Sequence, residues 1–191
     1  NIRGTLCLES VLDAGWNVVG VVAHPTSSAL FGKTVEDVAK EHKLPLYQPS
    51  RVNSSEFVKV LEGLEPDLCI LAGYSQIVKK SLINVPKLGT INLHGGLIPK
   101  YRGSSITRWV IINGEEVAGV SILEVDEGID TGPIIAQEQF RLPVNVKVRD
   151  VLMKQQEIFP GLLLSTLKSY AENTVQKEPQ ILEEGCYWHA L

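Results

Sequence analysis

Long apolar runs, paired cysteines and an excess of basic charge are all missing from this 191-residue sequence. It holds no apolar run of about 18 residues and no signal peptide, which argues against a membrane span and predicts a cytoplasmic protein. Its three cysteines (Cys7, Cys69 and Cys186) show no CxxC spacing and predict small core residues in a reducing compartment. The net charge of −4 at pH 7 gives no electrostatic case for nucleic-acid binding.

Several catalytic motifs are absent as well. The Asp130-Thr131-Gly132 tripeptide has no second copy, which excludes the paired carboxylates of an aspartic protease. No G-x-S-x-G follows a strand, so the serine hydrolase elbow is excluded. Dinucleotide binding is disfavoured because no G-x-G-x-x-G follows a strand either. The four histidines show no metal-ligand spacing, and no metal is expected.

What is present is an alternation of apolar strand patterns with helical patterns. This order is typical of βαβ units and predicts an α/β fold with a mostly parallel sheet and flanking helices. Thr34 with Asp37, and Ser54, are predicted helix N-caps, and Pro160 is expected to kink or divide the last helix. Helices are predicted at residues 5–14, 35–42, 56–63 and 148–170, strands at 17–23, 67–72, 90–93 and 119–125, a loop at 24–28 and an extended arm at 134–140.

The stretch at residues 90–135 carries the candidate chemistry. Its first strand ends in His94-Gly95-Gly96 and its second at Asp126-Glu127-Gly128, where glycines allow sharp turns. Asn92, His94 and Asp130 are therefore expected to meet in a crevice at the strand ends. Structural roles for these three residues remain alternatives: a packed core histidine, a turn-forming asparagine and an Asx-turn or N-cap aspartate.

An amide, an imidazole and a carboxylate at one place fit acyl transfer without a covalent enzyme intermediate. An amine that attacks a carbonyl builds negative charge on the carbonyl oxygen, which the Asn92 amide and a protonated His94 can stabilise. Asp130 would keep His94 protonated and relay the proton that the amine loses. No side chain in the sequence has the surroundings of an activated nucleophile.

At these residues the sequence resembles the 10-formyltetrahydrofolate-dependent formyltransferase family. The resemblance rests on Asn92-x-His94, on LIPKYRG at residues 97–103 and on DEGIDTG at residues 126–132, with Asp130 lying 36 positions after His94. It covers about residues 17–140 and implies a doubly wound, Rossmann-like domain that binds 10-formyltetrahydrofolate, with Asn92, His94 and Asp130 as the catalytic triad. The folate contacts that it implies are Gln76, Ile77 and Val78 on one side and Val125, Asp126, Glu127, Gly128 and Ile129 on the other.

The resemblance implies transfer of a formyl group to a primary amine by direct attack and a tetrahedral intermediate. A small-molecule acceptor, in particular a nucleotide-linked amino sugar, is favoured because residues 109–115 (WVIINGE) look most like the amino-sugar members, although Trp109 could equally be a core aromatic. Leu123 stands where glycinamide-ribonucleotide enzymes usually carry histidine. The alternatives are methionyl-tRNA formylation, hydrolysis of formyltetrahydrofolate, and a non-catalytic folate-binding domain of a larger protein.

The boundaries of the chain lead to further expectations. Residues 1–170 are predicted to form the catalytic domain, and residues 171–191 a C-terminal extension or the start of another segment. The chain begins at Asn1 without the first strand of the family, which we expect to be missing from the recorded sequence. A homo-oligomer or a fusion to further domains is compatible with these ends.

Overall fold

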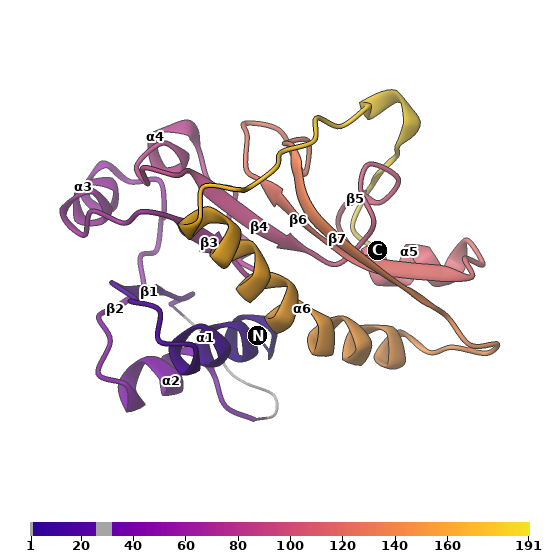
Figure 1. Cartoon of the computed structure of the whole chain (residues 1–191), viewed down its shortest axis with the longest axis horizontal. Helices are drawn as coiled ribbons and strands as arrows, with labels where there is room; N and C mark the ends of the chain where they lie inside the picture. The colour runs from indigo at the N-terminus through magenta and orange to yellow at the C-terminus, as the bar shows by residue number, and fades with distance from the viewer. Residues whose placement is uncertain (1, 26–31) are drawn as a thin grey trace. The chain divides into compact units, whose positions relative to one another are not determined.

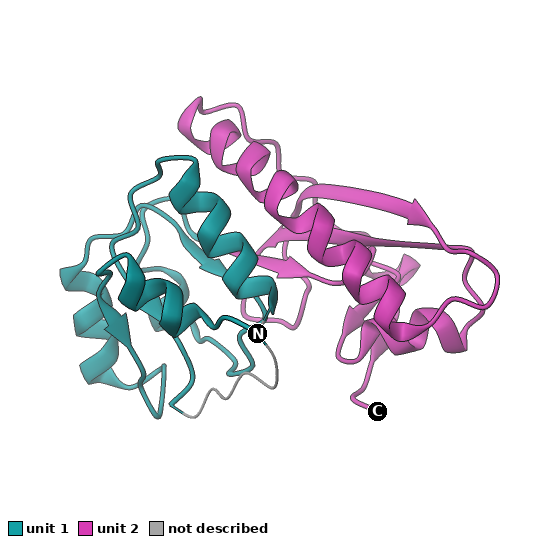
Figure 2. Cartoon of the chain, turned by 90° about the horizontal axis from the view of Figure 1, so that it is seen from below, with its two compact units in different colours: residues 1–90 teal, residues 91–191 magenta. Residues whose placement is uncertain are grey.

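The computed structural model describes residues 2–25 and 32–191. The chain forms two compact units, unit 1 at Asn1–Thr90 and unit 2 at Ile91–Leu191, which Figure 2 shows in teal and magenta. Of the loop predicted at residues 24–28, residues 26–28 lie outside the described residues. Within the described ranges no helix is both long enough and apolar enough to cross a membrane.

Unit 1 alternates short strands with helices. The capping predictions are confirmed: the Thr34 hydroxyl accepts from the Asp37 N–H at 3.1 Å while the Asp37 carboxylate accepts from the Thr34 N–H at 2.9 Å, and Ser54 caps the third helix through the Phe57 N–H. Strands β1 and β2 pair in parallel. The elements are α1 (Ile2–Asp13), β1 (Val21–Val22), α2 (Val35–Glu41), β2 (Leu46–Tyr47), α3 (Ser55–Gly63), β3 (Cys69–Leu71) and α4 (Lys80–Ile83).

Three predictions of element length in unit 1 need correction. The strand predicted at residues 67–72 covers Cys69–Leu71. The first helix begins at Ile2, earlier than predicted. The strand predicted at residues 17–23 shortens to Val21–Val22, because its partner β2 pairs with it only at these two residues, Val21 opposite Leu46 and Val22 opposite Tyr47. A β-branched run thus becomes a strand only as far as its partner extends.

Unit 2 is built around the eight-residue strand β6. The strand pairs antiparallel with β4 on one side and with β7 on the other, so the expectation of a mostly parallel sheet is wrong for these strands. The physical reason is that β7 returns directly from β6 as an antiparallel neighbour, with no crossover helix between them. The elements are β4 (Thr90–His94), β5 (Arg102–Gly103), α5 (Ile106–Ile112), β6 (Val117–Glu124), β7 (Ile134–Arg141), α6 (Val148–Ala171), a 3₁₀ turn (Leu182–Glu184) and β8 (Tyr187–Trp188).

Helix α6 continues through Pro160, so the predicted division of the helix does not occur. Its contacts with β6, β7 and α5 hold the helix in place although the proline ring cannot donate a backbone hydrogen bond. The predicted boundary after residue 170 falls at the end of α6, while the residues that follow it belong to unit 2. The division into a catalytic domain and an extension stays a prediction.

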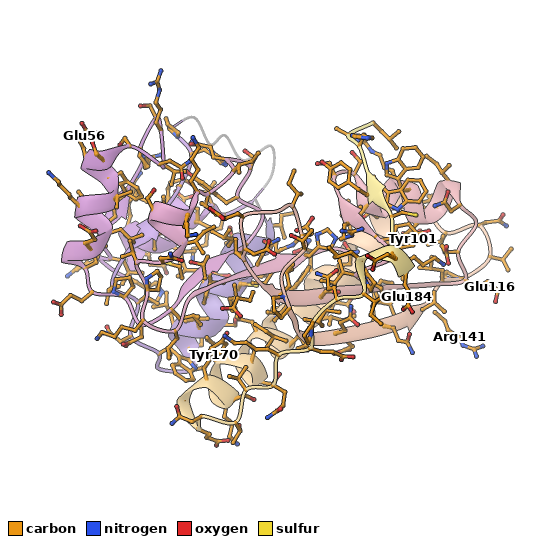
Figure 3. The ribbon with its side chains drawn as sticks, turned by 90° about the horizontal axis from the view of Figure 1, so that it is seen from above. Glu56, Tyr101, Glu116, Arg141, Tyr170 and Glu184 are labelled. Atoms are coloured by element: carbon orange, nitrogen blue, oxygen red, sulfur yellow. The ribbon has the colours of Figure 1, made fainter. Side chains whose placement is uncertain are left out.

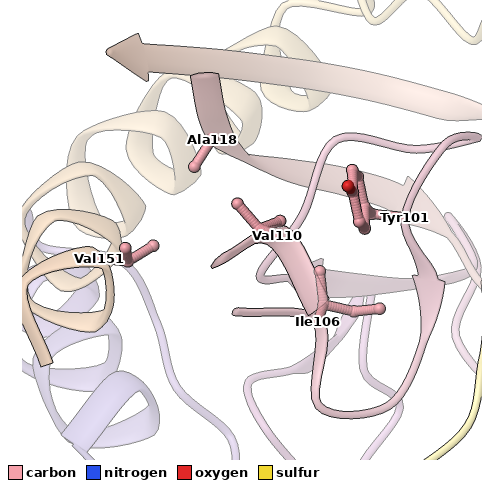
Figure 4. Close-up of a cluster of buried hydrophobic side chains, with 5 residues drawn as sticks. All are labelled: Tyr101, Ile106, Val110, Ala118 and Val151. Carbon is pink, nitrogen blue, oxygen red and sulfur yellow. The ribbon is translucent and has the colours of Figure 1, made fainter. Parts of the chain in front are cut away.

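A cluster of buried side chains fixes the position of Tyr101 in unit 2. Tyr101, Ile106, Val110, Ala118 and Val151 come from the loop after β4, from α5, from β6 and from α6 (Figure 4). Trp109 and Trp188 pack against this cluster. Because each of these elements contributes to the same core, the loop at residues 95–104 is held between the sheet and the helices rather than projecting freely.

Candidate active site

Asn92 and His94 lie on one face of β4. Side chains alternate along a strand, so residues two apart share a face, while Ile91 and Leu93 point into the core on the other. Strand β6 runs beside them, with Asn92 opposite Leu123 and His94 opposite Ser121. The strand thus presents an amide and an imidazole together.

Both ring nitrogens of His94 face hydrogen-bond acceptors. Nε2 lies 2.6 Å from the Tyr101 carbonyl oxygen, and Nδ1 lies 3.4 Å from Oδ2 of Asp130. A carbonyl oxygen and an ionised carboxylate can only accept, so a ring with a proton on each nitrogen satisfies both. His94 is 6% exposed. The ring of His94 is therefore buried between a backbone carbonyl and the Asp130 carboxylate.

Asp130 connects the other groups of the site. Its Oδ1 accepts from the Asn92 amide at 3.1 Å, and its Oδ2 accepts from the Gly103 N–H at 2.9 Å. The Asp130 side chain is 11% exposed. Its backbone adopts the left-handed region at φ 54°, which aspartate tolerates better than most residues. Because β6 runs antiparallel to β4, the loop after β6 must fold back along the strand to bring Asp130 to His94.

The predicted triad is thus brought together. Asn92, His94 and Asp130 all lie in unit 2, and Asp130 contacts both of the others. The arrangement differs in one respect from the strand-end crevice that the sequence suggested. Asn92 lies within β4, and only Asp130 comes from a loop that follows a strand.

Strand β6 holds the start of the loop that follows β4. The buried Ser121 hydroxyl donates to the Gly96 carbonyl at 2.6 Å and accepts from the Gln137 amide at 2.8 Å. The Gln155 amide of α6 donates to the Gly95 carbonyl at 2.8 Å. These side chains satisfy the Gly95 and Gly96 carbonyls and attach the start of the loop to β6 and α6.

The other end of this loop carries a polar cluster with shifted pKa values. The Tyr101 hydroxyl donates to Oε1 of Glu115 at 2.7 Å, and Lys100 lies 2.7 Å from the same oxygen. Burial, and next the Glu115 carboxylate, raise the pKa of Tyr101 to about 12. Lys100, and next the Tyr101 hydroxyl, lower the pKa of Glu115. A cavity of about 190 Å³ lies beside the cluster, lined in part by Leu97, Lys100, Tyr101 and Glu115.

The residues predicted to contact folate fall into both units. In unit 1, Gln76 accepts from the Val52 N–H at 3.1 Å, the Ile77 carbonyl accepts from Asn53 at 2.8 Å, and Val78 is buried. These contacts fix the segment at residues 76–78 to the loop at residues 50–53. Its role toward folate stays a prediction.

In unit 2, the Asp126 carboxylate accepts from the Gly128 N–H and from the Thr131 hydroxyl, so this side chain shapes its own loop. Val125 is half-buried, and Glu127, Gly128 and Ile129 are exposed. That these residues wall a bound folate likewise stays a prediction.

Sequence reasoning missed three groups that contact the triad. Tyr101 and Gly103 lie in the LIPKYRG motif, but their contacts run through backbone atoms, which a side-chain pattern does not reveal. Gln180 donates to the Asp130 carbonyl at 2.9 Å from a polar segment without any periodicity. In Figure 3 the labelled Tyr101 and Glu184 mark the two chain segments concerned. Within residues 2–25 and 32–191, no group of three or more possible metal ligands occurs.

Comparisons with known proteins identify the family of the chain. A family model described as formyl transferase matches residues 5–164. A methionyl-tRNA formyltransferase from Clostridioides difficile (strain 630) is 36% identical over 186 residues, which are 95% of this chain and 60% of that relative. The chain thus spans about 60% of the length of that curated relative.

Solved structures share the fold. The crystal structure of a phosphoribosylglycinamide formyltransferase from Bacillus halodurans has a TM-score of 0.76 at 29% identity and covers 90% of this chain and 93% of its own. An N-formyltransferase from Helicobacter canadensis, in complex with folinic acid and dTDP-3-aminofucose, has a TM-score of 0.78 at 22% identity and covers 99% and 67%. The α/β, Rossmann-like fold class is confirmed.

Proposed function

The chain belongs to the formyl transferase family, and on that premise we propose that it transfers a formyl group from 10-formyltetrahydrofolate to a primary amine. The observation that carries the proposal is the contact of Asp130 with both Asn92 and His94. Three polar groups of complementary chemistry meet on a strand and its neighbouring loop, His94 buried and the other two half-buried. They suit a reaction in which charge develops and a proton moves.

The donors of the site fit a formyl oxygen. The Asn92 amide nitrogen carries two N–H groups, of which one donates to Asp130, and the second can donate to an oxygen that becomes negative during attack. The positive His94 ring stabilises the same charge, and the buried surroundings strengthen this effect. 10-Formyltetrahydrofolate supplies an activated formyl group when it is bound.

The carboxylate of Asp130 has two tasks in this proposal. It keeps His94 charged, and it accepts the proton that the amine nitrogen loses when the new nitrogen–carbon bond forms. The same proton then leaves Asp130 for the nitrogen from which the formyl carbon departs, so the enzyme returns to its initial state. Formyl and proton are both accounted for without a covalent bond to the protein.

For the acceptor we propose the amino group of an aminoacylated tRNA. The support is the curated relative described above, which is named as a methionyl-tRNA formyltransferase. The amino-sugar acceptor favoured by residues 109–115 has weaker support, because the structure solved with an amino-sugar nucleotide is 22% identical to this chain and speaks for the fold alone. The argument from the net charge of −4 covers only these 191 residues, whereas the relative is longer.

The test is an acceptor-dependence assay on the full-length protein. It follows release of tetrahydrofolate from 10-formyltetrahydrofolate with methionyl-tRNA, with dTDP-linked amino sugars and with no amine. Release only with methionyl-tRNA supports the proposed acceptor, and release only with amino sugars overturns it. Formate without any amine would indicate hydrolysis, and folate binding without release would indicate a binding domain; either result overturns formyl transfer.

Substitutions test the assigned residues in the same assay. We expect Asn92→Ala, His94→Ala and Asp130→Asn each to lower kcat/KM by about 10²–10⁴-fold, the usual contribution of a positioned acid–base or charge-stabilising group. His42→Ala and Asp13→Asn change exposed residues of the same types and serve as matched controls. Turnover close to wild type in any one of the three site variants contradicts its role.

A further inference from the structure

The last residues of the chain lie beside the loop at residues 95–104, whose backbone contacts His94 and Asp130. Strand β8 pairs in parallel with β5, and Figure 1 shows the yellow end of the chain beside β5. The Arg102 N–H donates to the Cys186 carbonyl at 3.1 Å, and the Ser104 N–H donates to the Trp188 carbonyl at 2.9 Å. Arg102 also donates from its guanidinium to the Leu182 carbonyl at 3.1 Å.

This pairing aims the remaining N–H of β5 at the site. Successive N–H groups of a strand point to opposite edges. Because Arg102 and Ser104 donate toward β8, the Gly103 N–H between them points away from β8, and it donates to Oδ2 of Asp130 at 2.9 Å. One edge of β5 is therefore occupied by the C-terminal strand and the other by the triad carboxylate.

Two glycines allow this close approach. A Cβ at Gly103 would overlap the Trp188 carbonyl, and the backbone there has φ 101°, which side chains other than hydrogen disfavour. A Cβ at Gly185 would overlap the Pro99 carbonyl. The loop and the C-terminal segment are thus in backbone contact at both ends of their short pairing.

Trp188 contacts Tyr101 and Lys100, directly before the backbone carbonyl that faces His94. Its ring stacks on Tyr101 with centroids 5.7 Å apart, and its Nε1 donates to the Lys100 carbonyl at 3.1 Å. The ring of Trp109 packs against the ring of Trp188 with centroids 4.6 Å apart. The Tyr101 carbonyl, which faces Nε2 of His94, follows directly after these two attachments along the backbone.

Gln180 holds the second loop of the site. Its Nε2 donates to the Asp130 carbonyl at 2.9 Å and to the Gly132 carbonyl at 2.6 Å. Just before it, Glu178 and Ile134 exchange two backbone hydrogen bonds of 2.8 Å. Asp130 keeps a left-handed backbone, and contacts of this kind are what hold a residue in a sparsely populated conformation.

From these contacts we propose that the C-terminal segment (residues 178–191) positions the triad, with Trp188 and Gln180 as its positioning residues. Trp188 sets the Tyr101 carbonyl against His94, and β8 sets the Gly103 N–H against Asp130. Gln180 sets the backbone of Asp130 itself. The effect on turnover rests on the proposed function, whereas the effect on the His94 and Asp130 contacts does not.

The test compares Trp188→Ala, Trp188→Phe and Gln180→Leu in the full-length protein with two controls. Trp16→Ala changes a half-buried tryptophan of unit 1, and Gln176→Leu changes a glutamine whose side-chain amide donates to the nearby Thr174 carbonyl. We expect Trp188→Ala and Gln180→Leu to lower kcat by about 10- to 100-fold with little change in the KM for folate, since small misplacements of reacting groups have effects of this size. Trp188→Phe keeps the stacking and should restore most of the turnover.

A second measurement separates this inference from the proposed function. Nitrogen NMR of labelled histidine reports the two ring nitrogens of His94, whose signals are identified by their loss in His94→Gln. Trp188→Ala and Gln180→Leu should shift these signals, and both control variants should leave them in place. Unchanged signals and unchanged kcat in both variants overturn the positioning role. If the wild-type protein forms no formylated product but the signals shift, only the proposed function fails.

Discussion

Strands β6 and β8 both hold the loop at residues 95–104, but they differ in length and in surroundings. β6 has eight residues and is paired on both sides, and its Val120 and Ile122 are fully buried. β8 has two residues, and Tyr187 on it is 43% exposed. β6 reaches the start of the loop through Ser121, and β8 reaches its end through Trp188.

This difference between β6 and β8 separates two requirements of the site, which are a stable unit 2 and accurately placed polar groups. Buried apolar area on β6 contributes to the stability of the whole unit, since each fully buried aliphatic side chain is worth about 1.5–3 kcal/mol. β8 contributes a few hydrogen bonds and one aromatic stack, which open locally at a lower free energy than the core. β6 should therefore determine whether unit 2 folds, and β8 how accurately the acceptors around His94 and Asp130 are placed.

The largest expected effect on stability comes from a substitution in β6. Ile122→Ala removes a fully buried side chain and should lower the free energy of unfolding by about 2–5 kcal/mol through the lost burial and the cavity left behind. Trp188→Ala should lower the free energy of unfolding by less than Ile122→Ala does. The lost aromatic pair accounts for about 0.5–1.5 kcal/mol, and the lost contact area adds to this. Urea unfolding of the full-length variants, followed by circular dichroism, measures both.

Val144→Ala is the control for that comparison, because Val144 is 91% exposed and substitutions at such positions usually stay within about 0.5 kcal/mol. A loss for Trp188→Ala as large as that for Ile122→Ala would place β8 in the folding core. The distinction between the two strands would then fail.

The second prediction tests whether Trp188 of β8 shields the Tyr101 ring from solvent. The pKa of Tyr101 is raised to about 12, first by burial and next by Glu115, so its neutral form adds stability that is full below the ordinary value of 10 and is lost as the pH rises toward 12. Trp188→Ala uncovers the stacked ring face and should lower this pKa toward 10. Ultraviolet titration measures it, with Tyr101→Phe to identify the signal.

Gln180→Leu provides the contrast in that titration, because Gln180 contacts the Asp130 loop and not the Tyr101 ring. It should leave the pKa of Tyr101 where it is. A value that stays near 12 in Trp188→Ala would mean that the remaining members of the cluster around Tyr101 bury the ring without Trp188.

The sequence predicted best what depends on neighbours along the chain. The cap formed by Thr34 and Asp37 spans three residues, and the cap at Ser54 is equally local. The direction of β6 was not predictable in this way, because alternation reads the same for parallel and antiparallel strands. The meeting of Asp130 with His94 was expected from the strand ends and their glycine-bearing loops, and the family motif implied it as well.

The contribution of the C-terminal segment could not be predicted from the sequence. Its contacts join residues about eighty positions apart, such as Arg102 with Leu182 and Trp109 with His189. They are formed largely by backbone carbonyls, which every residue carries, so composition gives no signal for them. Only Gly103 and Gly185 mark the close approach, and a glycine alone does not name its partner.

The smallest expected effect concerns the link between the two strands. Glu115 precedes β6, and Lys100 and Tyr101 belong to the loop that β8 holds. Lys100, and next Tyr101, lower the pKa of Glu115 from its ordinary value of 4.5. A lowered pKa adds stability above about 4.5 that is lost as the pH falls below it. Because Lys100 is 61% exposed, solvent screening should keep the contribution below about 1 kcal/mol.

Glu115→Gln should therefore destabilise the protein slightly at neutral pH, and the difference from wild type should shrink as the pH falls below about 4. Urea unfolding at several pH values measures it, and Glu116→Gln, on the exposed neighbour labelled in Figure 3, is the control. A difference that persists at low pH would mean that the amide accepts from the Tyr101 hydroxyl less well than the carboxyl group does, and that this loss outweighs the ion pair. Added salt separates the two, because salt weakens an exposed ion pair and leaves a neutral hydrogen bond largely unchanged.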